Sequence, residues 1–318
     1  MSNLIISRSQ EILLPTPIPQ LEGHFHVELL DAKTQEVKQE LKFKNLIVNA
    51  GLDGIGAGNN LQNMYVWLGV GTGAVAPTNA DVQLGAQIGT RVNNNGGFAD
   101  TFGYGAANAY SFQKRTRLLL EAEGNGNLSE LGLFGLQVGA PMWTRQLFKD
   151  INGVTTVITK TSADQLRITY ELRINIPGDL AGTVTIDSVL YNTVTRPANV
   201  GSFWSNDQFG DFRGLSPASM VVHNGAIGVS TGAPGGAEAA TNTSATASAY
   251  VNGNYFRDVT HVFDPAIGNL TGGVRSASYW TTGNSALART FQTDFGVGIP
   301  KINTKRLTLV VRHAWGRV

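Results

Sequence analysis

Two histidines lie two residues apart near the start of the chain, in the stretch HFHVELLD at residues 24–31. On a β-strand, side chains at positions i and i+2 point to the same face, so we expect His24 and His26 to share a face. Three chains around a threefold axis would bring six imidazoles together, a set of ligands suited to iron or zinc. Within one chain two histidines are too few, and an ordinary exposed strand is the simpler interpretation. The remaining histidines are isolated on separate predicted strands: His223, His261 and His313.

The stretch WLGVGTGAVAPTNADV at residues 67–82 looks like a phosphate-binding loop, because Gly69, Gly71 and Ala74 fit the spacing G-x-G-x-x-A. A phosphate loop needs a helix that begins at the glycines, so that its first amides face the anion. Here no segment with helical period follows, no acidic residue stands where a ribose would need one, and no Lys-Ser or Lys-Thr follows the glycines. We favour the alternative, a strand at 64–71 that ends in a glycine turn.

Acidic residues stand next to aromatic ones in FDPAIGN and WSNDQFGDF, which contain Asp264, Asp207 and Asp211. Such clusters could bind or hydrolyse a sugar, but they are also ordinary turn and core residues, and we favour the ordinary role. The zinc-protease pattern H-E-x-x-H is absent from the sequence. We therefore assign no catalytic, cofactor-binding or metal-binding residue, expect no cofactor, and expect that the protein is not an enzyme. A polysaccharide hydrolase is the enzymatic alternative.

The composition limits the classes of protein to which the chain can belong. Its 24 Lys plus Arg balance 23 Asp plus Glu, which gives a formal net charge of +1 and argues against nucleic-acid binding and a polybasic membrane anchor. Charged residues make up 15%, against about 25% in an average globular protein, and 38 of 318 residues are glycine. Such a composition is typical of an all-β protein partly covered by other subunits. No apolar run is long enough for a membrane helix, so we expect no membrane insertion.

Local patterns predict short strands along most of the chain. Prolines at alternate positions favour an extended arm within residues 1–20, namely Pro15, Pro17 and Pro19. A hairpin with strands at 24–31 and 37–47 follows the arm. A short helix is predicted at 49–58, and a flexible or extended surface loop at 228–248. The clearest strand runs from Leu166 to Ile174, where apolar residues alternate with polar ones, so that one face is buried.

Four stretches of the first half are matched in the same order in the second half. The pairs are 69–82 with 228–241, 126–129 with 268–271, 144–150 with 288–294, and 158–174 with 299–315. Matches in one order predict an internal duplication. We therefore expect an extended N-terminal arm and β-hairpin at 1–44, followed by two related antiparallel β-sandwich domains. The first sandwich would occupy 45–190, and the second, a degenerate copy, 191–318.

Several motifs together resemble a family of tailed-bacteriophage virion proteins of the tail-associated or fibre type: FKNLIVNAGLDGIG, WLGVGTGAVAPTNADVQLGAQI, NLSELGLFG, MWTRQLFKD and VITKTSADQLRITYELRI. The resemblance covers residues 42–180 and includes the order of the motifs. It implies a non-enzymatic, oligomeric building block of the virion, assembled in the cytoplasm of the bacterial host, and it transfers no catalytic residues. The second half departs from the pattern, since Gly272–Gly273 stand where the first half has Glu130–Leu131.

The resemblance leads us to expect a structural component at the neck, tail or fibre base, present as a symmetric homo-oligomer whose partners are other virion proteins. The arm and the hairpin would attach to a neighbouring subunit by strand addition. Two alternatives stay open. One is a capsid decoration protein. The other is a receptor- or glycan-binding module that recognises a host surface glycan through aromatic residues of the second half, namely Trp204, Phe209, Phe212 and Trp280.

Overall fold

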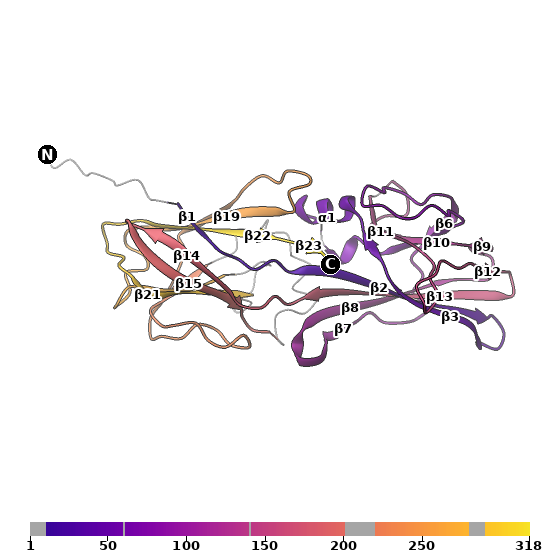
Figure 1. Ribbon diagram of the computed structural model, residues 1–318, viewed down its shortest axis with the longest axis horizontal. Coiled ribbons are helices and arrows are strands. Elements are labelled where there is room, and N and C mark those ends of the chain that lie inside the picture. The colour runs from indigo at the N-terminus through magenta and orange to yellow at the C-terminus, as the bar shows by residue number, and fades with distance from the viewer. Residues whose placement is uncertain (1–10, 60, 140, 201–219, 280–289) are drawn as a thin grey trace. The chain divides into compact units, whose positions relative to one another are not determined.

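A computed structural model describes residues 11–59, 61–139, 141–200, 220–279 and 290–318 (Figure 1). Within these residues the chain is almost entirely β-strand, which confirms the all-β class. The described helices are α1 (Asn49–Gly56) and two short 3-10 helices, η1 (Leu61–Asn63) and η2 (Ala106–Asn108). The chain divides into two compact units. Unit 1 consists of Met1–Pro19 and Ile176–Trp315, and unit 2 of Gln20–Asn175 and Gly316–Val318.

Unit 2 contains a six-stranded sheet, in which β23, β2, β13, β8 and β7 follow one another and β3 pairs with β2. Its strands are β2 (Gln20–Asp31), β3 (Val37–Lys44), β7 (Thr101–Tyr104), β8 (Tyr110–Leu119), β13 (Asp164–Asn175) and β23 (Gly316–Arg317). A five-stranded sheet, in the order β4-β11-β10-β5-β6, contains β4 (Leu46–Ile47), β5 (Trp67–Gly71), β6 (Gln87–Val92), β10 (Glu130–Phe134) and β11 (Met142–Leu147). A separate pair contains β9 (Gly126–Leu128) and β12 (Ile158–Lys160).

The inner face of the six-stranded sheet is apolar because its strands alternate with period two. Along β13 every second side chain from Leu166 to Ile174 is buried, and the residues between them face outward, as the sequence predicts. Tyr170 lies in this core, with its ring centroid 5.0 Å from that of Phe25 on β2. Its hydroxyl accepts a hydrogen bond of 3.0 Å from the indole of Trp143 on β11. These contacts join the two sheets into a β-sandwich.

The predicted hairpin and the predicted helix are both present. β2 and β3 pair antiparallel, and α1 covers most of the predicted range 49–58. β2 also pairs along its whole length with β13, from Gln20 opposite Asn175 to Asp31 opposite Asp164. The hairpin is therefore part of the sandwich of unit 2.

Unit 1 contains a six-stranded sheet in the order β14-β15-β21-β20-β16-β17, made of β14 (Leu180–Ile186), β15 (Val189–Pro197), β16 (Val221–His223), β17 (Ala239–Thr241), β20 (Val274–Tyr279) and β21 (Phe291–Ile299). Its four-stranded sheet, in the order β1-β22-β19-β18, contains β1 (Glu11–Leu14), β18 (Ser244–Ala247), β19 (Phe256–Phe263) and β22 (Leu307–Ala314). The range 228–248, expected to be a flexible or extended loop, includes two short strands, because β17 pairs with β16 and β18 pairs with β19.

The observed units have other boundaries than the expected ranges 1–44, 45–190 and 191–318. β1 pairs with β22 and belongs to unit 1, whereas the hairpin belongs to unit 2. β14 and β15, expected in the first sandwich, instead join unit 1, where β15 pairs with β21. At the other end of the chain, β23 pairs with β2. The chain therefore passes between the units after each of three residues, Pro19, Asn175 and Trp315.

The two units share one pattern of strand pairing. In unit 2, β5 lies between β6 and β10, β10 pairs with β11, and β8 pairs with β7 and β13. In unit 1, β16 lies between β17 and β20, β20 pairs with β21, and β19 pairs with β18 and β22. The corresponding strands also follow one another in the same order along the chain. This agreement is what an internal duplication would produce, and the duplication itself stays a prediction.

A buried lysine holds a similar turn in each unit. Lys160 Nζ donates hydrogen bonds to backbone carbonyls and to Asn125 Oδ1, which lies 2.9 Å away. Lys301 Nζ also donates to backbone carbonyls and to Asn269 Oδ1, at 3.3 Å. In both turns the glycine before the asparagine has a positive φ. The turn at Asn269 thus corresponds in structure to the turn at Asn125. The sequence match had instead paired 268–271, which contains Asn269, with 126–129, just after Asn125.

Replacing either lysine by methionine is expected to destabilise the unit that contains it. Methionine keeps the apolar stem but leaves buried oxygen acceptors without a donor, which costs about 1–3 kcal/mol. Lys160→Met should lower the free energy of unfolding of unit 2, and Lys301→Met that of unit 1, measured by hydrogen exchange in peptides from β13 and β22. Lys33→Met, in an exposed turn, is the matched control. Exchange unchanged from the wild type in both variants would contradict the role of the lysines.

Candidate functional site

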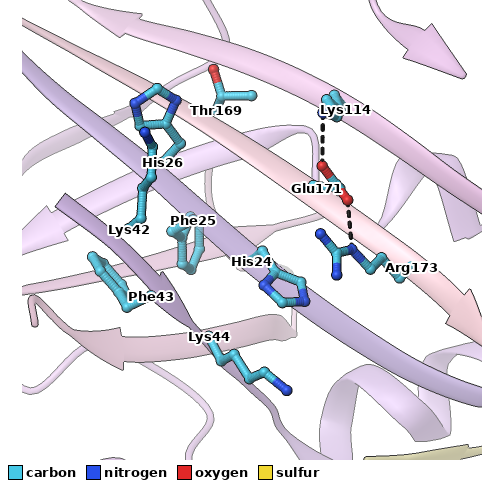
Figure 2. Close-up of a pocket in the computed structure, with 10 residues that line it drawn as sticks. All are labelled: His24, Phe25, His26, Lys42, Phe43, Lys44, Lys114, Thr169, Glu171 and Arg173. Carbon is cyan, nitrogen blue, oxygen red and sulfur yellow. Dashed lines mark hydrogen bonds and ion pairs between the residues drawn. The ribbon is translucent and has the colours of Figure 1, made fainter. Parts of the chain in front are cut away.

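A hollow of about 470 Å³ lies on the outward face of the six-stranded sheet of unit 2 (Figure 2). Its lining comes from four neighbouring strands, β3, β2, β13 and β8. Most of the lining side chains are polar, and most of these are basic: His24, His26, Lys42, Lys44, Lys114, Thr169, Glu171 and Arg173. In this hollow His24 and His26, the two histidines considered in the sequence analysis, lie among lysines, an arginine and a glutamate.

Strand register brings these side chains together. His24 lies opposite Lys44 on β3 and opposite Glu171 on β13, and Glu171 lies opposite Lys114 on β8. Residues that are in register on adjacent strands point to the same face, so all four side chains face outward. His26, two residues further along β2, also faces outward, as the sequence predicts (Figure 2).

Glu171 is the carboxylate of the hollow, and two cations hold it. Its oxygens lie 2.9 Å from Lys114 Nζ and 2.5 Å from Arg173 Nε. Burial raises the pKa of the Glu171 carboxyl, but the hydrogen bonds from Lys114 and Arg173 outweigh burial, and the pKa lies below its ordinary value. Glu171 is therefore a fixed anion and is not available as a general acid near neutral pH.

Each of the two histidines lies beside a glutamate. His24 Nε2 is 3.3 Å from Glu22 Oε1, and His26 Nε2 is 2.7 Å from Glu40 Oε1. Burial, together with the charge of Arg173, lowers the pKa of His24, so its imidazole is neutral at pH 7. Among the described residues, no group of three or more His, Cys, Asp or Glu is placed to hold a metal ion. The metal site on a threefold axis stays the alternative to the ordinary exposed strand, and it would require an oligomer.

The chemistry that the hollow supports is binding. Lys42 and Lys44 are mostly exposed, and each lies beside a glutamate at the edge of the hollow, Lys42 beside Glu40 and Lys44 beside Glu22. The pair of Lys42 with Glu40 is exposed on both sides and contributes little to stability, so an incoming carboxylate, sulfate or phosphate can exchange with Glu40 at low cost. The lysines, the arginine and the neutral imidazole supply hydrogen-bond donors for an acidic ligand.

The glycine stretch at 67–82, together with the residues at 85–86, surrounds a carboxylate of the protein itself. Glu130, which is 0% exposed, accepts hydrogen bonds from the amides of Gly73 (3.1 Å), Gly85 (3.1 Å) and Ala86 (2.7 Å). A Cβ added to Gly73 would lie 2.3 Å from Glu130 Oε1, so this close approach requires glycine. The interpretation as a strand with a glycine turn is confirmed by β5. These amides already donate to the Glu130 carboxylate, so they are not available to bind a phosphate.

Arg145 completes this network. Its Nε donates to Glu130 Oε2 at 2.8 Å, and its Nη1 donates to Asp81 Oδ2 at 2.7 Å. Burial raises the pKa of the Glu130 carboxyl, but the amides and Arg145 outweigh burial and hold the pKa below its ordinary value. The sequence analysis did not predict the network. Glu130 is the first residue of an apolar strand, ELGLF, and a polar residue at a strand end is ordinarily exposed.

Most candidate residues of the second half lie outside the described residues: Trp204, Asp207, Phe209, Asp211, Phe212 and Trp280. Asp264 is described. Its Oδ1 lies 3.0 Å from Arg306 Nη2, and its carbonyl accepts a hydrogen bond of 3.0 Å from Lys301 Nζ. Asp264 therefore takes part in holding a turn, in keeping with the ordinary role favoured for it.

The stretch GVSTG at 228–232 has the spacing G-x-S-x-G of a nucleophile elbow, a match that sequence reasoning overlooked. A nucleophile elbow places its serine between a strand and a helix. Ser230 lies in an exposed turn between β16 and β17, and the described chain forms no helix there. The match is therefore one of spacing alone.

Two histidines of unit 1 are buried without hydrogen bonds. His261 on β19 is 0% exposed and His313 on β22 is 4% exposed, and no ring nitrogen of either has a partner among the described residues. Burial lowers the pKa of His261 to about 3 and that of His313 to about 4. His223 is buried as well, but its Nε2 lies 3.1 Å from Ser278 Oγ. His261 and His313 are thus neutral core residues whose protonation would be costly.

The fold and the candidate site define an all-β protein of β-sandwich units with an ion-paired hollow on an outward sheet face. No protein-family model, curated protein or solved structure matches the chain. In the described part of the chain, no helix has the length and apolar character needed to cross a membrane.

Proposed function

We propose that the protein is a non-enzymatic structural component of a tailed-bacteriophage particle, located at the neck, tail or fibre base. It assembles there as a symmetric oligomer and attaches to other virion proteins. The observation that carries the proposal is that β1 and β23, near the two ends of the chain, each join a sheet as an added parallel strand. Strand addition through backbone hydrogen bonds is a general way in which one chain attaches to another.

The motifs that carry the resemblance have roles in packing, which supports a structural function. NAGLDGIG forms α1, and the glycine stretch wraps Glu130. SELGLF supplies Glu130, and the YEL strand supplies Tyr170, whose hydroxyl binds Trp143 in the core. These residues stabilise the sandwich of unit 2, whereas Lys44, Glu171 and Arg173 of the same motifs line the outward hollow.

The test is immunogold electron microscopy with an antibody against this chain on intact particles from its source. Label at the neck, tail or fibres is the expected result and selects among the positions. Label over the head would make the protein a capsid decoration protein. Absence of label on well-formed particles, with the protein present in the lysate, would contradict a displayed virion role.

A second candidate function is binding of an acidic glycan in the hollow. The observation that favours it is the lining, which includes four cations, Lys42, Lys44, Lys114 and Arg173, and one carboxylate, Glu171. This lining differs from the aromatic site expected in the second half. A ligand with carboxylate or sulfate groups matches such donors better than a neutral sugar does.

Acidic glycans are expected to bind the wild-type protein on a glycan array, and the double variant Lys42→Ala with Lys44→Ala should bind them at least about tenfold more weakly. Both lysines are exposed, so the substitutions should leave the fold intact. Lys33→Ala with Lys149→Ala in the same unit is the matched control. An array without signal, or equal loss in the control, would remove the glycan candidate.

A further inference from the structure

β1 fits unit 1 through side chains as well as through its backbone. Ile12 and Leu14 point inward and are 4% and 1% exposed. Just beyond the strand, the carbonyl of Pro15 accepts a hydrogen bond of 2.7 Å from Thr195 Oγ1. A Cβ added to Gly182 would lie 2.6 Å from the ring of Pro15, so this glycine makes room for the arm. The edge of β22, together with these residues, forms a binding position for residues 11–15.

No short loop connects β1 to β22, so the β1 strand that occupies this position can come from the same chain or from a second copy of the protein. Glu11 lies in register with Thr308, so almost the whole chain separates β1 from its neighbour β22. The pairing is parallel, and parallel strands cannot be joined by a hairpin. The remainder of unit 1, Ile176–Trp315, therefore receives β1 as it would receive a separate extended peptide.

The segment that links β1 to β2 favours an extended course. Three of the five residues at 15–19 are prolines, which fix φ and carry no amide hydrogen. Such a segment is stiff and spans about 16 Å, at about 3.1 Å per residue. Exchange of a terminal element between copies of a protein is a low-cost route to association, because the exchanged element keeps its contacts and only the linking segment takes another course.

We propose that in the assembled oligomer β1 of one copy occupies the edge of β22 in unit 1 of a second copy. The second copy makes the same contacts with Ile12, Leu14 and Pro15 that a single chain makes, and only the residues at 17–19 change their course. Two copies that exchange β1 reciprocally close as a dimer, whereas one-way exchange links copies head to tail and closes into a ring when the rotation allows it. This inference rests on the proposed oligomeric role, and it adds the element that joins the subunits.

The absence of cysteine from the chain allows a direct test with the full-length protein. Leu13 and Val310 are in register on β1 and β22, and adjacent strands lie about 4.8 Å apart, within the range that a disulfide bridges. The double variant Leu13→Cys with Val310→Cys is oxidised, and its oligomeric state is measured by light scattering. Its covalent state is then read on a denaturing gel without reductant. Leu13→Cys with Val154→Cys, an exposed position of unit 2, is the control pair.

Exchange predicts covalent dimers and higher multimers, and the same linkage when separate Leu13→Cys and Val310→Cys chains are refolded together. An oligomer whose disulfides are all within single chains would overturn exchange and leave the oligomeric role standing. A monomer with a disulfide within its chain would overturn both. Two free, reactive thiols in the folded double variant would mean that β1 does not occupy the β22 edge, and would also overturn the proposal.

Discussion

Replacing Glu130 by alanine is expected to lower the free energy of unfolding of unit 2 by about 3–5 kcal/mol. The substitution removes one of the two carboxylates that pair with Arg145, which is 4% exposed, and leaves Asp81 as its remaining anion. It also leaves the amides of Gly73, Gly85 and Ala86 without their acceptor. A urea titration, read by hydrogen exchange in peptides from β10 and β13, measures the loss.

Two variants separate the network from general effects of mutation. Glu36→Ala removes an exposed glutamate of the same unit and should change the free energy of unfolding by no more than about 0.5 kcal/mol. Glu130→Gln keeps one acceptor oxygen for the amides but removes the charge, so it should fall between the wild type and Glu130→Ala. Equal stability of Glu130→Ala and Glu36→Ala would show that the glycine loop does not depend on the carboxylate.

Unit 1 is expected to lose about 4 kcal/mol of stability between pH 7 and pH 5 through His261 and His313. In the unfolded chain a histidine binds its proton near pH 6.5, whereas burial lowers the folded pKa values to about 3 and about 4. Below pH 6.5 the unfolded state therefore binds protons that the folded state does not. Each histidine then costs up to about 1.4 kcal/mol per pH unit until its folded pKa is reached.

Hydrogen exchange in peptides from β19 and β22 between pH 7 and pH 5 measures this loss, after correction for the intrinsic pH dependence of exchange. The double variant His261→Leu with His313→Leu cannot take up these protons, so the stability of its unit 1 should change much less over the same range. Peptides from β13 in unit 2 serve as an internal reference. If the wild type and the variant lose stability in parallel as the pH falls, the two histidines are not the cause.

The periodic parts of the fold could be predicted because their signal is local. Alternation from Leu166 to Ile174 identifies a strand with one buried face, and the turn between 31 and 37 identifies a hairpin. Which strands pair over long distances has no local signal. Nothing in the residues of β13 indicates that β2, rather than another strand, covers its edge, because any extended backbone offers the same donors and acceptors.

The site could be predicted only in part, for the same reason. That His24 and His26 share a face follows from the period of a strand. That Glu171 and Arg173 lie beside His24 depends on the register between β2 and β13, which the periodicity leaves undetermined. Glu130 carries still less signal, since its partners come from the amides of a loop, and an amide is present at every residue except proline.

The parallel pairing of β1 with β22 also sets an order of events during synthesis. Glu11 leaves the ribosome long before Thr308, its partner in the sheet, has been translated. At about 5–20 residues per second, the nearly 300 residues between them take about 15–60 s. During this interval β1 has no completed β22 edge in its own chain to bind. A finished chain nearby has a completed β22 edge, and its own β1 is the competitor for that edge. We therefore expect exchange to be most efficient during translation of many copies from one message, before that β1 has docked.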